Sequence, residues 1–179
     1  MKPIKIVVNT TLAIIALVFL SSCSASRIPE GVRAVQPFDA TRYTGKWYEI
    51  ARLDHSFERG MSHVTAEYSD NGDGTFKVVN RGFSERKNKW SQAVGRAKFI
   101  GAPDVGHLKV SFFGPFYGGY IVFDIDPENY QYALVSGPNH SYFWLLSRTP
   151  TISDDLKIRL IQKAKLAGFD TSKLIMVQQ

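Results

Sequence analysis

The feature that most constrains the fold of this chain is a series of short strand-like runs separated by turn signals. The first run begins at Trp47, and the others span residues 63–68, 75–83, 92–100, 107–113, 120–126, 132–136 and 142–148. Runs of this length and spacing are typical of an all-β sandwich or barrel. Asn71-Gly72-Asp73-Gly74 lies between two runs, and its Asn-Gly and Asp-Gly pairs favour a tight hairpin. The segment is not a calcium loop, because it lacks the ligand spacing and the closing Glu.

Apolar and polar residues alternate within the runs, which indicates one buried face per strand. Leu108, Val110 and Phe112 share one face, and Lys109 and Ser111 share the other. An eight-stranded antiparallel meander with an inward apolar set closes into a barrel just wide enough for one small ligand. We therefore predict an all-β fold, an eight-stranded antiparallel up-and-down β-barrel.

One helical pattern follows the strands and is expected to form a C-terminal α-helix packed outside the barrel. Thr151 or Ser153 can cap its start, and Gly168 ends it. Its apolar stripe consists of Leu156, Leu160, Ile161 and Ala164. Residues 174–177 then indicate a short ninth strand.

The N-terminus has the pattern of an export signal. Lys2 and Lys5 precede an apolar run that is densest over residues 12–20 and ends in Leu20-Ser21-Ser22-Cys23. We predict a lipoprotein signal peptide over residues 1–22, with lipid attachment at Cys23. An uncleaved membrane anchor is the alternative, but the run is short and interrupted for a spanning helix. Cys23 is the only cysteine, so the exported domain contains no disulfide.

Composition separates a tether from a single domain. Residues 23–37 contain two prolines and a glycine without a clear period, so we expect a lipidated N-terminus and tether before a domain at 38–179. Without Lys2 and Lys5 the net charge falls from +6 to +4. No long Lys/Arg run is present, which favours weak attraction to an anionic lipid surface over nucleic-acid binding.

The segment that opens the domain is expected to close one end of the barrel. Asp39 or Thr41 can cap a helical turn there. Gly45 lets another backbone pass close, and Trp47 can plug the barrel end.

Several motifs together resemble the lipocalin family. They are Gly45-Lys46-Trp47-Tyr48-Glu49, the eight runs, Leu146-Ser147-Arg148-Thr149-Pro150 and the following helix. The lipidation box and the runs at 111–120 and 148–153 are similar to its bacterial outer-membrane lipoprotein branch, which is related to apolipoprotein D. The family's Thr-Asp-Tyr motif survives only as Asp126, and the disulfides of animal members are absent. The resemblance implies a structural motif at the closed end, made of Gly45, Trp47, Asp126 and Arg148, with Arg148 stacked on the Trp47 ring.

Strand direction places the loops near residues 53–62, 84–91, 114–119 and 136–141 at the opposite, open end. The first is the longest, contains Phe57 and Met61, and can act as a lid. Inward parity predicts a ligand pocket lined by Glu49, Ala51, Thr65, Glu67, Phe76, Val78, Asn80, Ala97, Phe99, Leu108, Val110, Phe112, Tyr120, Val122, Ala133, Val135, Tyr142 and Trp144. Basic residues near the open end either attract a phosphate or carboxylate or are ordinary solvated loop residues: Arg52, Arg59, Arg86, Lys87 and Lys89.

No pattern in the chain requires catalysis, and we predict neither an enzyme nor a cofactor. The histidines His55, His63, His107 and His140 have no metal-ligand spacing, and most are expected to be solvated. A Glu49–Glu67 pair can in principle do acid–base work, but polar residues in a wet pocket explain it more simply.

The resemblance implies a binding protein anchored by lipid at the periplasmic face of the outer membrane. Ser24 after the lipidated Cys favours that membrane. The expected ligand is a fatty acid, a lysophospholipid or a similar amphiphile, which the protein stores or transports. The alternatives are a lipid-modifying enzyme and a structural envelope lipoprotein with a filled barrel. Ligand identity, direction of transfer and oligomeric state stay open.

Overall fold

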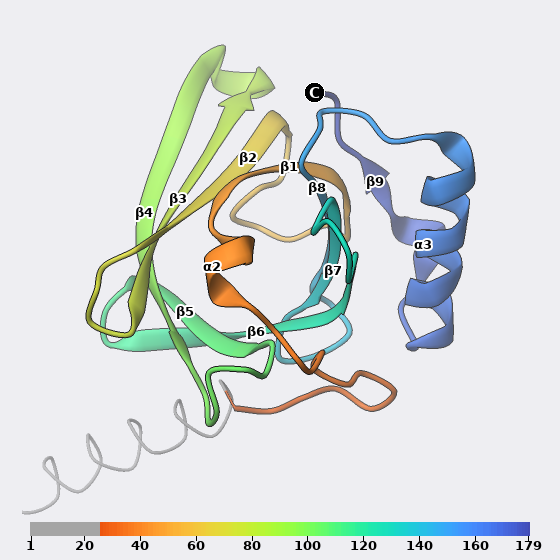
Figure 1. Cartoon of the computed structure of the whole chain (residues 1–179). Coiled ribbons are helices and arrows are strands. Elements are labelled where there is room, and N and C mark those ends of the chain that lie inside the picture. Colours follow the sequence, from red (N-terminus) through yellow and green to blue (C-terminus); the bar gives the residue numbers. More distant parts are fainter. Residues whose placement is uncertain (1–25) are drawn as a thin grey trace, which may run out of the picture.

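A computed structural model describes residues 26–179, which form a closed barrel with a helix on its outside (Figure 1). The strands are β1 (Gly45–Arg52), β2 (Met61–Asp70), β3 (Thr75–Ser84), β4 (Lys89–Phe99), β5 (His107–Phe113), β6 (Phe116–Ile125), β7 (Tyr132–Ser136), β8 (Phe143–Ser147) and β9 (Ile175–Met176). The helices are α2 (Ala40–Tyr43), η1 (Glu85–Lys87), α3 (Asp154–Leu166) and η2 (Thr171–Lys173). The signal peptide and the lipidation site predicted at Cys23 lie outside the described residues.

The strand order confirms the predicted up-and-down barrel. Strands β2 to β8 pair in sequence order, and β1 pairs with both β2 and β8, which closes the ring. All of these pairings are antiparallel. Strands β2, β4 and β6 begin two to four residues earlier than their composition indicates. In β6, Gly118 and Gly119 pair with Val110 and Lys109. Two glycines have little tendency to form a strand, so pairing with β5 stabilises the extended backbone there.

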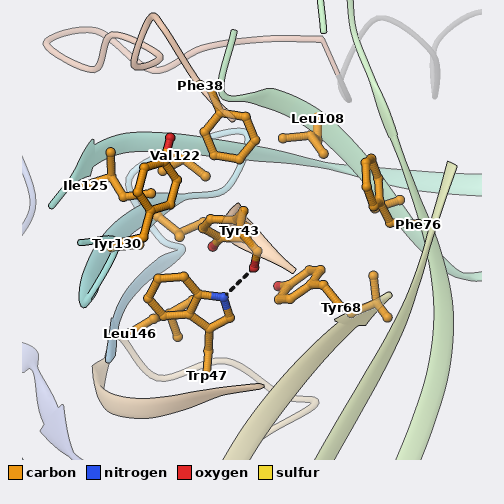
Figure 2. Close-up of a cluster of buried hydrophobic side chains, with 14 residues drawn as sticks. Phe38, Tyr43, Trp47, Tyr68, Phe76, Leu108, Val122, Ile125, Tyr130 and Leu146 are labelled. Carbon is orange, nitrogen blue, oxygen red and sulfur yellow. Dashed lines mark hydrogen bonds between the residues drawn. The ribbon is translucent and has the colours of Figure 1, made fainter. Parts of the chain in front are cut away.

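The buried side chains form two layers, one inside the barrel and one between the barrel and α3. The inner cluster contains Phe38, Tyr43, Trp47, Tyr68, Phe76, Val78, Ala97, Leu108, Val122, Ile125, Tyr130, Ala133, Val135 and Leu146 (Figure 2). The outer cluster contains Val32, Ile50, Ala51, Leu53, Ile121, Leu134, Phe143, Leu145, Leu160, Ala164, Ala167 and Phe169. Successive strand residues thus alternate between two apolar environments wherever α3 covers the wall.

The segment that enters the domain closes one end of the barrel. Asp39 caps α2 by accepting from the backbone N–H groups of Thr41 and Arg42. Figure 1 shows α2 within the ring of strands. Gly45 follows with φ at +90°, a backbone conformation that favours glycine.

The tryptophan and arginine of the sequence motif meet at this closed end. The Trp47 indole is fully buried, and its Nε1 donates to the Tyr43 carbonyl at 2.8 Å (Figure 2). The Arg148 guanidinium lies 3.7 Å from the Trp47 ring centroid. It also donates to the carbonyls of Tyr130, Lys46 and Arg42. The expected stacking contact is therefore present, and the arginine ties three segments together.

Asp126 stabilises the turn that connects β6 and β7 at the closed end. Its carboxylate accepts from the backbone N–H groups of Glu128 and Gln131 and so holds the β6–β7 connection. This role needs only a carboxylate at the start of the turn, which explains why the rest of the family's motif can be lost.

Helix α3 packs its apolar stripe against the outer cluster. Ser153 caps it by accepting from the Leu156 N–H, so Ser153 rather than Thr151 is the cap. Leu160 and Ala164 are buried against the wall, and Gly168 ends the helix region with φ at +94°. Beyond α3, β9 pairs with Ala51 and Arg52 of β1. No helix within residues 26–179 is long and apolar enough to cross a membrane.

The expected tether is only partly a linker. Val35 donates to the Val122 carbonyl at 2.9 Å and accepts from Gly106 at 2.9 Å. Val32 and Phe38 are buried on either side of it. Residues 32–38 therefore belong to the folded body.

Candidate ligand-binding site

The interior wall of the barrel contains most of the residues predicted to line a pocket. Phe76, Val78, Ala97, Phe99, Leu108, Val110, Phe112, Tyr120, Val122, Ala133, Val135 and Trp144 belong to the inner cluster or pack against it. Asn80 pairs with Ala66, whose side chain also packs on the inner cluster. Val110, Phe112 and Tyr120 keep exposed surface although they face inward. Solvent therefore reaches this wall.

Two predicted pocket residues of β2 lie on the wrong face. Ala66 is paired with Trp47, and directly opposite residues point to the same side of a sheet. Thr65 and Glu67, which alternate with Ala66, therefore point outward, and Glu67 is exposed. The error came from placing polar residues inside, whereas the apolar members of the strand face the interior. The proposed Glu49–Glu67 acid pair does not exist.

Ala51 is also displaced from the interior. The register of β1 against β8 shifts between Glu49 and Ala51, so Ile50 and Ala51 both join the outer cluster. An irregularity of this kind reverses the alternation beyond it. It brings Arg52 to the inner side opposite Trp144, with only 1% of Arg52 exposed. The sequence could not signal this shift. Arg52 was expected near the open end, either attracting a phosphate or carboxylate or lying in solvent, and its burial contradicts the second expectation.

A polar group at the barrel mouth, here called the mouth cluster, consists of four buried residues and one partly buried tryptophan: Glu49, Arg52, His55, Glu58 and Trp144. Arg52 Nη1 donates to Glu49 Oε1 at 2.6 Å, and its Nη2 donates to the Glu58 carbonyl at 2.9 Å. Trp144 Nε1 donates to Glu58 Oε2 at 3.1 Å. His55 Nε2 lies 3.1 Å from the same oxygen. The loop of residues 53–60 is thus held in the mouth by its own carboxylate and by Arg52.

The pKa values of the two carboxyl groups in the mouth cluster are shifted in opposite directions. Burial, and then the nearby Glu58 carboxylate, raise the pKa of Glu49 well above its usual range, outweighing Arg52. Burial also raises the pKa of Glu58, but the hydrogen bonds and charge of its neighbours, chiefly His55, bring it below the ordinary value. The pKa shifts therefore favour a protonated Glu49 beside an ionised Glu58, so the two buried acids do not both carry charge.

Aromatic rings cover the mouth cluster from the open side. The His55 and Phe57 rings stack with centroids 3.9 Å apart, and Trp144 lies 5.2 Å from His55. Tyr142, the remaining predicted pocket residue, stacks with Trp144 at 6.2 Å. His55 is therefore buried, contrary to its expected place on the solvated surface. The first loop does fold over the mouth, as a lid would.

A second polar group lies deeper, formed by three tyrosine hydroxyls. The Tyr43 and Tyr120 hydroxyl oxygens are 2.7 Å apart, and Tyr68 donates to Tyr120 at 2.8 Å. Burial raises the pKa of all three tyrosines, so they remain neutral donors and acceptors. Sequence reasoning missed Tyr43 and Tyr68. The alternation of Val64, Ala66 and Tyr68 was the signal for the latter.

Other candidate features are less connected to the interior. A hollow of about 290 Å³ at the closed end is lined by α2 and by the β2–β3 hairpin, away from the mouth cluster. Arg59 pairs with Asp54 at 2.8 Å, whereas Arg86, Lys87 and Lys89 are exposed beside η1. Within residues 26–179, no group of three or more His, Cys, Asp or Glu side chains could hold a metal ion.

Comparison with known proteins adds sequence relationships to this geometry. A family described as a lipocalin-like domain matches residues 38–179. Outer membrane lipoprotein Blc of Vibrio cholerae is 55% identical, over 93% of this chain and 96% of that protein. The protein of the same name from Escherichia coli K12 is 54% identical, over 88% and 89%. Apolipoprotein D of Mus musculus is 30% identical, over 79% and 77%.

Solved structures show the same architecture at lower identity. Insecticyanin from Manduca sexta matches with a TM-score of 0.65 and 23% identity, over 86% of this chain and 87% of that chain. An amine-binding protein of Rhodnius prolixus, in complex with tryptamine, matches with a TM-score of 0.60 and 20% identity, over 81% and 83%. At this identity the likeness concerns the fold alone.

Proposed function

This chain belongs to the lipocalin family, and from that premise we propose that its barrel binds a fatty acid, a lysophospholipid or a similar amphiphile. Close relatives named as outer membrane lipoproteins support a role in storing or transporting such a ligand at that membrane. The same relationships favour binding over catalysis.

The observation that carries the proposal is the character of the interior wall. It is mostly apolar, and several inward side chains, including Val110 and Phe112, remain partly exposed. Its polar groups are concentrated in the mouth cluster and the tyrosine hydroxyls. A mostly hydrophobic concave wall with few polar groups suits a ligand with a long chain and one polar head.

The polar head of the ligand is expected near the open end. Arg52 is already engaged by Glu49 and by loop carbonyls, so it is a poor partner for a phosphate. Arg86, Lys87 and Lys89 are exposed there and supply positive charge. The head therefore stays in the solvated rim, and the chain enters the barrel.

Native mass spectrometry tests the binding proposal. Delipidated protein is titrated with mixed fatty acids and lysophospholipids, and bound species are identified by mass. Val110→Trp fills the interior and should abolish the bound adducts. Lys109→Trp, one residue away on the opposite face, should leave them unchanged. Equal binding by both variants would place the ligand outside the barrel.

The anchoring proposal has its own test, since it concerns residues before the described body. If Cys23 carries the lipid, Cys23→Ser releases the protein from the membrane fraction, because lipidation supplies the attachment. Washing membranes in high salt before immunodetection removes adsorbed protein. A mutant that stays with washed membranes contradicts the lipid anchor.

A further inference from the structure

Solvent-exposed aromatic side chains lie at the tips of two open-end loops. Phe113 and Phe116 flank the two-residue β5–β6 turn and are 80% and 62% exposed. Phe57, at the tip of the loop over the mouth, is 54% exposed. In an up-and-down barrel the β1–β2 and β5–β6 connections lie at the same end. Three exposed aromatic rings therefore lie at one rim, on two separate loop tips.

The connecting turns at the two ends of the barrel differ in charge, although the closed end also holds Arg42, Lys46 and Arg148 outside its turns. The closed-end turns, residues 70–74, 100–106 and 126–131, contain Asp70, Asp73, Asp104, Asp126 and Glu128 and no basic residue. The open end has exposed basic residues in and beside η1: Arg86, Lys87 and Lys89. None of these three has an ion-pair partner within residues 26–179. The nearby Glu85 accepts from the Ser62 hydroxyl.

We infer that the open end docks on an anionic lipid bilayer, with Phe57, Phe113 and Phe116 inserted among the headgroups and the η1 basic residues facing lipid phosphates. Aromatic rings beside basic residues are typical of interfacial membrane contacts. A protein partner of stable affinity needs a continuous complementary face of about 800 Å². Separated loop tips fit a deformable surface better. Within the described residues, the closed-end turns carry no exposed large hydrophobic side chain, so the aromatic rings select the open end for this contact.

This contact goes beyond the proposed function, because it does not require that any ligand be bound. It has a consequence for that function nonetheless. An acyl chain would pass between bilayer and barrel without crossing bulk water, since the rim that meets the lipid also surrounds the mouth.

The contact is measured with an environment-sensitive fluorophore on a single introduced cysteine. Gly114→Cys places the probe between Phe113 and Phe116, where an added side chain meets no atom within 4 Å. Ser69→Cys places it on an exposed site at the closed end of β2. Full-length protein purified from cells is mixed with vesicles of phosphatidylethanolamine, with or without phosphatidylglycerol. Wild type treated with the same dye reports any labelling at Cys23.

The inference predicts a blue-shifted probe at position 114 that is quenched by lipids brominated in the acyl chain, and an unshifted probe at position 69. Phosphatidylglycerol should strengthen the quenching. Combined Arg86→Gln, Lys87→Gln and Lys89→Gln should remove that enhancement, and combined Phe113→Ser and Phe116→Ser should reduce quenching severalfold.

Three results would overturn the inference: no quenching at position 114, equal quenching at both positions, or a shift that depends on protein concentration and not on vesicles. The last would identify a second copy of the chain as the partner. Native mass spectrometry of the Phe113→Ser, Phe116→Ser variant separates the two proposals. Retained ligand adducts with lost docking confirm that the rim acts on the membrane and not on the ligand.

Discussion

At the scale of single residues, Arg148 joins separate segments of the closed end. It stacks on buried Trp47 and donates to three carbonyls from separate segments. Arg148→Ala should lower the free energy of unfolding by about 3 kcal/mol, because it removes the stacking and leaves carbonyls without donors. Urea denaturation measures the change.

Arg81→Ala is the matched control, since the exposed Arg81 guanidinium lies 5.9 Å from the Trp90 ring centroid. Its cost should stay below about 1 kcal/mol. If both substitutions cost the same, the motif arginine has no special structural role.

The raised pKa of Glu49 makes stability depend on pH. In the unfolded chain this carboxyl ionises near its ordinary value, whereas in the folded protein it keeps its proton to higher pH. The folded state thus binds more protons in that window, and stability falls as pH rises through it. Glu49→Gln does not titrate, so its melting temperature should rise relative to wild type between about pH 5 and about pH 8.

Differential scanning calorimetry across this range checks the Glu49 prediction. Glu67 lies on the exposed outer face, so the melting temperature of Glu67→Gln should change with pH in the same way as that of wild type. A Glu49→Gln curve that also runs parallel would mean that Glu49 is ionised in the folded protein.

At the scale of elements, the strands were predictable in number but not in every register. Alternation of apolar and polar residues identifies β5 to the residue, and a short apolar run identifies β7. Alternation cannot reveal the shift between Glu49 and Ala51, because both faces of β1 are buried there. A strand between two apolar layers carries no pattern that shows which way its side chains point.

Helix α3 gives a prediction that separates two cap candidates. The Ser153 hydroxyl accepts from the Leu156 N–H, whereas Thr151 offers its backbone carbonyl to Thr149. Ser153→Ala should therefore cost about 1 kcal/mol of stability. Thr151→Ala should change it by less than about 0.5 kcal/mol, and the reverse order in urea denaturation would reassign the cap.

At the scale of the whole molecule, the sequence was sufficient for the closed barrel and for most of the interior wall. It was insufficient for the mouth cluster, whose members come from β1, β8 and the loop between β1 and β2. Glu58 and His55 carried the signal of a polar surface loop, and only tertiary contact with Arg52 and Trp144 makes them buried. Long-range pairs of this kind have no local periodicity.

The central claim, an acyl chain inside the barrel, is tested most directly by affinity against chain length. Saturated fatty acids and lysophospholipids of increasing length are titrated by calorimetry against wild type, Trp144→Ala on the interior wall and Trp90→Ala on the exposed side of β4. Each added methylene should strengthen binding by about 0.8 kcal/mol until the barrel is full. Affinity should weaken in Trp144→Ala and stay unchanged in Trp90→Ala. An affinity independent of chain length, or equal in all three proteins, would contradict the account.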